Sequence, residues 1–175
     1  MTLHHKWSKR LAILTIGATV AISGGVISSP QPTQAATNND TATIDATITS
    51  TSKADSIIAL GKRYLGTPYK FGAAVGQTRN FDCSTLTKYI FGKYGITLPR
   101  TAAQQSKVGS YVSKSNWKKG DLLFFSVPGR SGVGHVGVYL GNNKMLNTYG
   151  AGGVKISTIN SYWNSHYMTA RRVIK

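Results

Sequence analysis

The residue with the clearest capacity for chemistry is Cys83, the one cysteine among 175 residues. It lies in the segment Phe81-Asp82-Cys83-Ser84-Thr85, at the predicted start of a helix. Unpaired backbone amides and the helix dipole at such a position favour the thiolate over the thiol, and the thiolate is the nucleophilic form. The same amides can hold the oxyanion of a tetrahedral intermediate. The alternative is a small buried hydrophobe, the common role of an unpaired cysteine.

A cysteine nucleophile needs a partner that accepts and returns a proton, and histidine does both near neutral pH. Beyond residue 36 the chain holds only His135 and His166. His135 lies in the run 133–140, where apolar residues alternate, so its imidazole should face away from the core with Gly137 leaving space beside it. His166 lies in a polar aromatic stretch without alternation, which indicates a surface or packing residue. We therefore expect His135 to be the general base and acid.

A third polar group should orient the imidazole, and Asn147 is the candidate. The sequence Gly141-Asn142-Asn143 is typical of a hairpin turn. If the loop leaves three residues unpaired, Gly137 lies opposite Asn147, which then shares the face of His135. A two-residue loop would place Asn147 on the other face unless a bulge intervenes. The alternative role for Asn147 is that of a turn or edge-strand residue.

Metal binding is the competing use of cysteine and histidine. One cysteine and two histidines fall short of a closed four-ligand zinc site, and no two of them have helical i, i+4 or C-x-x-C spacing. The five acidic residues are all aspartates, which leaves little for a carboxylate-rich metal cage or a paired-carboxylate glycosidase site. We expect no metal and no other cofactor.

Three helices are predicted in the first part of the domain. Ser52-Lys53-Ala54-Asp55 has the form of a capping box, and apolar residues at helical spacing follow it until Gly66. A second helix opens at Asp82 or Cys83 and runs to Tyr94, and a third covers residues 101–108.

The period changes after Gly120 to short runs of β type, separated by glycine and asparagine. The predicted strands cover residues 121–127, 133–140, 144–149, 154–157 and 168–174. Helices first and strands later predict one α+β domain, in which the N-terminal helices pack on one face of a mainly antiparallel C-terminal sheet.

Residues 1–36 have the pattern of a secretory signal peptide. Three basic residues precede an uncharged run over 11–27, and a small-residue stretch ends at Ala35-Ala36. The alternative, a retained transmembrane anchor, fits less well because the run is short and contains three glycines. Residues 37–52 are small and polar and predict a flexible linker, which leaves 53–175 as the folded domain. We expect a secreted protein without a transmembrane anchor.

The charge of the chain is strongly positive, with 21 Lys and Arg against five acidic residues and a net charge of +16. Setting aside residues 1–36, which hold three of the basic residues, leaves 18 against five, or +13. The basic residues are scattered singly or in pairs, without a basic helix, zinc-finger spacing or RNA-binding motif, which argues against nucleic acid. The charge instead predicts attachment to anionic polymers, such as those of a bacterial wall.

Six motifs in order resemble the NlpC/P60 family of secreted bacterial cell-wall cysteine peptidases. The resemblance runs from about Ala54 to Arg172. The motifs are Gly66-Thr67-Pro68-Tyr69-Lys70-Phe71-Gly72, Phe81-Asp82-Cys83-Ser84, Leu98-Pro99-Arg100-Thr101-Ala102, Lys119-Gly120-Asp121-Leu122-Leu123-Phe124-Phe125, Gly134-His135-Val136-Gly137-Val138-Tyr139 and Lys144-Met145-Leu146-Asn147.

This resemblance implies a papain-like α+β fold and hydrolysis of peptidoglycan stem peptides, typically at the bond that follows D-isoglutamate. It makes Cys83 the nucleophile and His135 the base and acid. Tyr69 resembles the tyrosine whose hydroxyl helps to hold the oxyanion; its alternative role is packing behind a glycine-rich loop. Asp82 and Ser84 match residues that contact the peptide, including its free amine, although Asp82 could instead only cap the helix.

Two positions depart from the family pattern. Thr85 stands where the family often has glycine, and we expect this β-branched residue to narrow the cleft. Asn147 stands where histidine is more frequent, an arrangement that resembles the Cys-His-Asn set of papain.

The sequence thus predicts a secreted cysteine endopeptidase that cuts stem peptides of the bacterial cell wall. Two alternatives remain. One is an amidase or acyltransferase on the same scaffold, and the other is a basic wall-binding protein without catalytic activity.

Overall fold

The computed structural model describes residues 53–175. The predicted signal peptide, the predicted linker and Ser52 of the first capping box lie outside the described residues. The elements are a helix over 53–62 and then α2 (Cys83–Gly92), α3 (Ala102–Gln105), β1 (Ser110–Tyr111), η1 (Lys114–Asn116), β2 (Leu122–Phe125), β3 (His135–Gly141), β4 (Lys144–Thr148), β5 (Val154–Thr158), α4 (Ser161–His166) and β6 (Tyr167–Arg172).

The six strands form one sheet in the order β1-β6-β2-β3-β4-β5, and every pairing between these strands is antiparallel. The five predicted strands are all present, and no strand end differs from its prediction by more than two residues. The predicted α+β class is therefore confirmed. No helix within residues 53–175 is long and apolar enough to cross a membrane.

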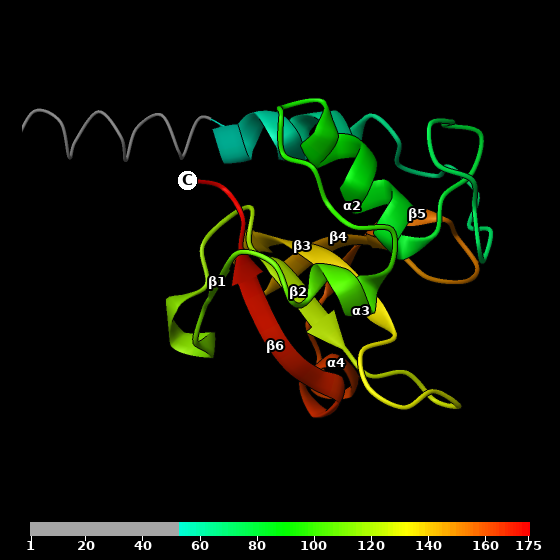
Figure 1. Ribbon diagram of the computed structural model, residues 1–175. Coiled ribbons are helices and arrows are strands. Elements are labelled where there is room, and N and C mark those ends of the chain that lie inside the picture. The colour runs from blue at the N-terminus through cyan, green and yellow to red at the C-terminus, as the bar shows by residue number, and fades with distance from the viewer. Residues whose placement is uncertain (1–52) are drawn as a thin grey trace, which may run out of the picture. The chain divides into compact units, whose positions relative to one another are not determined.

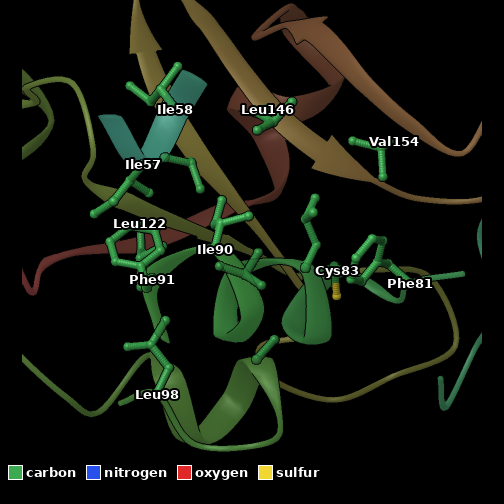
Figure 2. Close-up of a cluster of buried hydrophobic side chains, with 14 of the residues drawn as sticks. Ile57, Ile58, Phe81, Cys83, Ile90, Phe91, Leu98, Leu122, Leu146 and Val154 are labelled. Carbon is green, nitrogen blue, oxygen red and sulfur yellow. The ribbon is translucent and has the colours of Figure 1, made fainter. Parts of the chain in front are cut away.

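The sheet is covered on both faces, because alternate residues of β2 point to opposite sides and all four are buried. Leu122 and Phe124 belong to the larger cluster, which the first helix and α2 complete (Figures 1 and 2). Leu123 and Phe125 belong to a second cluster with Trp163 of α4. The prediction that helices pack on one face is right for the N-terminal helices, but α4 lies on the other face (Figure 1).

Three short elements are absent from the predictions: β1, η1 and α4. They span two, three and six residues, too few for an apolar period to show in the sequence. The helix α2 ends at Gly92, two residues before the predicted Tyr94, and α3 covers only four residues. Turns follow both helices, and Gly95 has a φ of +77°.

The β3–β4 hairpin determines which side chains share a face with His135. Asn142 and Asn143 form a two-residue turn with φ of 49° and 57°, the conformation that a tight hairpin requires. The register shifts between Tyr139 and Gly141, and Val138 pairs with Leu146. The predicted register is therefore correct, but it arises from a two-residue turn and a bulge rather than from a three-residue loop. Asn147 consequently lies on the same face as His135.

Candidate active site

The nucleophile candidate stands at a firmly capped helix start. Asp82 is the N-cap of α2: its Oδ1 accepts the Thr85 N–H at 2.8 Å, and Thr85 Oγ1 accepts the Asp82 N–H at 2.9 Å. Thr85 is 3% exposed and turns toward this cap, not toward the cleft. The expectation that Thr85 narrows the cleft is therefore wrong. Its role is to close the capping box that positions Cys83 in the first turn.

A buried glutamine ties the first turns of α2 to α3. The Gln105 side chain is fully buried, and its Nε2 donates to the carbonyl of Ser84 at 3.0 Å and to that of Pro99 at 2.9 Å. Its Oε1 accepts the Thr87 hydroxyl at 2.8 Å. The polar atoms of this amide are thus all used within the domain, and the backbone next to Cys83 is held in place.

Cys83 opens onto a cleft of about 390 Å³. Figure 2 shows Cys83 beside Phe81, at the margin of the buried cluster where α2 begins. Of the predicted site residues, Tyr69, Asp82, Cys83 and Ser84 line the cleft. The cleft is also lined by Arg100, Arg130, Gly134 and Tyr149.

The loop that carries Tyr69 is fastened to the residues just before Cys83. A parallel bridge joins Tyr69 to Phe81, in which the Lys70 N–H donates to the Phe81 carbonyl at 2.9 Å and the Phe81 N–H donates to the Pro68 carbonyl at 3.0 Å. Burial raises the pKa of Tyr69, and electrostatic interactions with the Cys83 and Asp82 side chains raise it further. The phenol is therefore protonated at neutral pH and can donate a hydrogen bond into the cleft.

His135 is fully buried in a cage of aromatic rings. Its ring stacks on Trp163 at 5.0 Å between centroids with an interplanar angle of 27°, and Tyr149 covers it at 5.1 Å. Burial lowers the pKa of His135 to about 3, Asn147 acts in the opposite direction, and the charge of Lys155 lowers it further. The resting imidazole is therefore neutral at physiological pH, so one ring nitrogen can accept a proton.

Asn147 presents an unused acceptor on the face of His135. Its Nδ2 donates to Ser157 Oγ at 2.9 Å, which leaves Oδ1 buried without a partner. Both ring nitrogens of His135 also lack one. Position 137 has no room for a larger residue, because a Cβ there would lie 2.8 Å from Met145 Sδ and 3.3 Å from Asn147 Cβ. The carbonyl oxygen and the imidazole are thus complementary neighbours, as the orienting role requires.

The protonation state of Cys83 differs from the sequence prediction. Burial raises the pKa of Cys83 to about 11, and the charge of Asp82 acts in the same direction. The backbone N–H groups of Val136, Ser84 and Cys83 itself lower it, but they do not offset burial. The prediction of a resting thiolate is therefore wrong. The resting site contains a neutral thiol whose sulfur lies against the N–H of Val136, the residue directly after His135.

Asp82 has a second bond network besides the helix cap. Arg100 Nη2 donates to Asp82 Oδ2 at 2.6 Å and to the Ala73 carbonyl at 2.7 Å. Arg100 Nη1 donates to Ser84 Oγ at 3.1 Å, and this hydroxyl donates to Asp82 Oδ1 at 3.0 Å. The carboxylate therefore caps the helix and is neutralised by Arg100, while Ser84 stands between them.

His166 lies at the end of α4 and does not line the cleft. Its Nδ1 is 2.8 Å from the carbonyl of Tyr162. This agrees with the predicted surface or packing role. Within residues 53–175, no three His, Cys or acidic side chains gather into a group that could hold a metal ion.

Four residues of the site were not predicted: Arg100, Arg130, Tyr149 and Trp163. Tyr149 lies two positions after Asn147, so strand alternation offered a signal for it. Arg100 stands in one of the six quoted motifs, but its partner is 18 positions away. Trp163 and Arg130 lie in a short helix and a loop, where no period identifies them.

Comparisons with known proteins find a matching family model and several relatives. The NlpC/P60 family model matches residues 66–172. The chain is 42% identical over 118 residues to the probable endopeptidase p60 of Listeria monocytogenes, covering 67% of this chain and 23% of that protein. It is 36% identical over 118 residues to the gamma-DL-glutamyl hydrolase of Bacillus subtilis, covering 66% of this chain and 28% of that protein. The chain thus spans about a quarter of the length of these two relatives.

Solved structures share the fold. An NlpC/P60 family protein from Bacillus cereus superposes with a TM-score of 0.65 at 36% identity, covering 70% of this chain and 40% of that one. The peptidoglycan hydrolase RipB of Mycobacterium tuberculosis superposes with a TM-score of 0.63 at 29% identity, covering 73% of this chain and 68% of that one. The predicted papain-like arrangement is therefore confirmed at the level of the fold.

Proposed function

Because the chain belongs to the NlpC/P60 family, we propose that it is a cysteine endopeptidase that hydrolyses stem peptides of peptidoglycan. The observation that carries the proposal is the arrangement around Cys83. The Cys83 thiol lies at a capped helix start and lines a cleft. His135 on β3 has a neutral imidazole, and the side-chain amide of Asn147 lies beside it. Relatives named gamma-DL-glutamyl hydrolase and DL-endopeptidase support cleavage at the bond that follows D-isoglutamate.

The resting protonation states define the first step. His135 takes the proton of Cys83 as the sulfur attacks the scissile carbonyl carbon, which forms a carbon–sulfur bond and a tetrahedral oxyanion. The amides at the start of α2 and the Tyr69 hydroxyl donate to this oxyanion. The imidazolium then protonates the departing amine as the carbon–nitrogen bond breaks, and Asn147 Oδ1 holds the ring through its other N–H.

The second half of the reaction regenerates the enzyme. Water attacks the thioester while His135 accepts its proton, and the carbon–sulfur bond breaks as the thiol is restored. Because both resting groups are neutral, the transfer of the proton from Cys83 to His135 accompanies the attack on the substrate. We assign Asp82, Ser84 and Arg100 to contacts with the peptide next to Cys83.

The proposal extends to the location of the protein. Residues 1–36 act as a signal peptide and 37–52 as a linker, so that the domain 53–175 works outside the cell without a transmembrane anchor. The excess of basic residues holds it on anionic wall polymers. The support for these statements is the composition of the chain.

The test is digestion of purified peptidoglycan by the full chain, with mass spectrometry of the released fragments. We expect cut stem peptides.

Cys83→Ala and His135→Ala should each lower the rate by at least about a thousandfold. Asn147→Ala should lower kcat by about 10- to 100-fold with little change in KM, because it acts through His135. The matched control is His166→Ala, which should retain full activity.

Three results would contradict the proposal. Release of intact stem peptides would indicate an amidase on the same scaffold. Binding to peptidoglycan without any fragment would indicate a wall-binding protein, and undiminished cleavage by Cys83→Ala would remove the nucleophile assignment.

A further inference from the structure

Two arginines line the cleft, and they differ in whether a carboxylate neutralises their charge. Arg100 is bonded to Asp82, Ser84 and the backbone. No aspartate of residues 53–175 pairs with Arg130, since the three in that part of the chain pair with Arg100, Lys119 and Arg172. The ionised side chains that line the cleft are therefore one carboxylate and two guanidinium groups, with a net charge of +1. The uncompensated charge is that of Arg130.

Arg130 is held on the cleft by an aromatic ring rather than by an anion. Its guanidinium carbon lies 4.7 Å from the centroid of the Phe71 ring, and Phe71 is 66% exposed although it lines the cleft. The two residues come from different loops, one after Tyr69 and the other between β2 and β3. A guanidinium stacked on a ring keeps its in-plane N–H donors free, and these donors form the fork that binds a carboxylate.

The charge of Arg130 also affects Tyr69. It acts to lower the pKa of Tyr69, against the larger effect of burial. Tyr69 is the residue whose hydroxyl we assign to the oxyanion. Arg130, Tyr69 and Cys83 line the same cleft, so an anionic group of the substrate close to the scissile carbonyl would be within the field of the guanidinium.

A γ-linked glutamate supplies such an anion. Its peptide bond is made through the side-chain carboxyl, so its α-carboxylate remains free a few bonds from the scissile carbonyl. On the basis of the proposed function, we propose that Arg130 binds this α-carboxylate. Arg130 thereby selects stem peptides with a free α-carboxylate over those in which the α-carboxylate is amidated. Phe71 positions Arg130 for this contact.

The test uses two synthetic stem peptides that differ only at this group, one with the α-carboxylate and one with the α-carboxamide. The full chain should cleave the carboxylate peptide with a kcat/KM about 10- to 100-fold higher, the range of one charge-assisted bidentate contact. Arg130→Gln should remove this preference by lowering kcat/KM on the carboxylate peptide alone. Arg130→Lys should retain part of it, since it keeps the charge but not the fork.

The matched control is Arg79→Gln, which removes one exposed positive charge that does not line the cleft. It should leave the preference unchanged. An equal loss on both peptides in Arg130→Gln, or no preference in the unmodified chain, would overturn the assignment of Arg130 while leaving the peptidase proposal in place. Failure of the unmodified chain to cut either peptide would instead overturn the peptidase proposal, and this inference with it.

Discussion

At the scale of single residues, the protonation of His135 connects the active site to stability. The imidazole is enclosed by the rings of Trp163, Tyr149 and Phe125, and no aspartate of residues 53–175 pairs with it. Such a site accommodates the neutral ring and excludes the charged one, because burial without a counter-charge penalises the cation. The same enclosure that keeps the imidazole neutral therefore makes the fold sensitive to acid.

The expected pH dependence follows from the pKa of His135, which is about 3 in the folded protein and 6.5 in its unperturbed state. The unfolded chain binds a proton between these values and the folded protein does not, so stability is lost as the pH falls from about 6.5 toward 3. The free energy of unfolding should decrease by about 1 kcal/mol per pH unit in this window on account of this group. Urea unfolding at pH 7.0, 5.5 and 4.5 measures the slope.

The comparison is with His135→Phe, which keeps an aromatic ring in the cage but cannot be protonated. Its slope should be shallower than that of the unmodified protein, while the slope of His166→Phe should be unchanged. The three proteins differ only at the histidine, so the difference in slope between them is the decisive quantity. Equal slopes for all three proteins would show that His135 is not buried as a neutral base.

At the scale of elements, the start of α2 is the structure on which the nucleophile depends. Cys83 occupies the first position of this helix, and the reciprocal bonds between Asp82 and Thr85 define where the helix begins. Gln105 fixes the next turn from α3. Cys83 is thus placed by three buried polar side chains and not by the periodicity of the helix.

Thr85→Ala tests this cap. Removal of Oγ1 leaves the buried Asp82 N–H without its acceptor, so the free energy of unfolding should fall by about 1 to 2 kcal/mol. Thr85→Ser keeps the hydroxyl and should stay within about 0.5 kcal/mol of the unmodified protein. Urea unfolding near neutral pH provides both values. Equal stability of the alanine and serine variants would show that the box does not hold the helix start.

The β3–β4 hairpin is the second element that decides the site. The bulge near Leu140 corrects the register by one residue, and without it Asn147 would point to the opposite face of the sheet. The position of Asn147 on the face of His135 therefore depends on a bulge that lies seven positions before Asn147 in the chain.

At the scale of the whole molecule, the excess positive charge is a property of the folded domain. Residues 53–175 hold 18 Lys and Arg against three Asp, a net charge of +15, and each of the three aspartates is within an ion pair. The remaining positive charge has no carboxylate side chain within this part of the chain to neutralise it. An anionic polymer in the surroundings would therefore be attracted to the domain as a whole.

This charge predicts a salt-dependent attachment to the wall. The fraction of the protein retained on isolated bacterial walls should fall by about tenfold or more between 0.05 M and 0.5 M salt, because screening shortens the range of surface charges. Walls stripped of their phosphate polymers are the control and should retain little protein at either concentration. Retention that does not change with salt would show that charge does not mediate the attachment.

Much of the site follows from the sequence alone. The motif around Cys83 predicted a helix start, the alternation around His135 predicted a strand, and the turn residues after it predicted the register of Asn147, and the structure has all three. These inferences succeed because they depend on local rules: helix caps, strand alternation and hairpin turns act over a few residues. The α+β class follows for the same reason, since the order of apolar periods along the chain reflects the order of the elements.

Tertiary structure alone decided the rest. Tyr149, Trp163, Arg100 and Arg130 reach the site from separate turns, loops and short helices, and their contacts join residues far apart in the chain. The sequence likewise did not predict the protonation states of Cys83 and His135. Both side chains are neutral because they are buried, and their burial depends on every element that packs around them. A helix start by itself favours a thiolate, but the low polarity of the enclosed site outweighs the local amides.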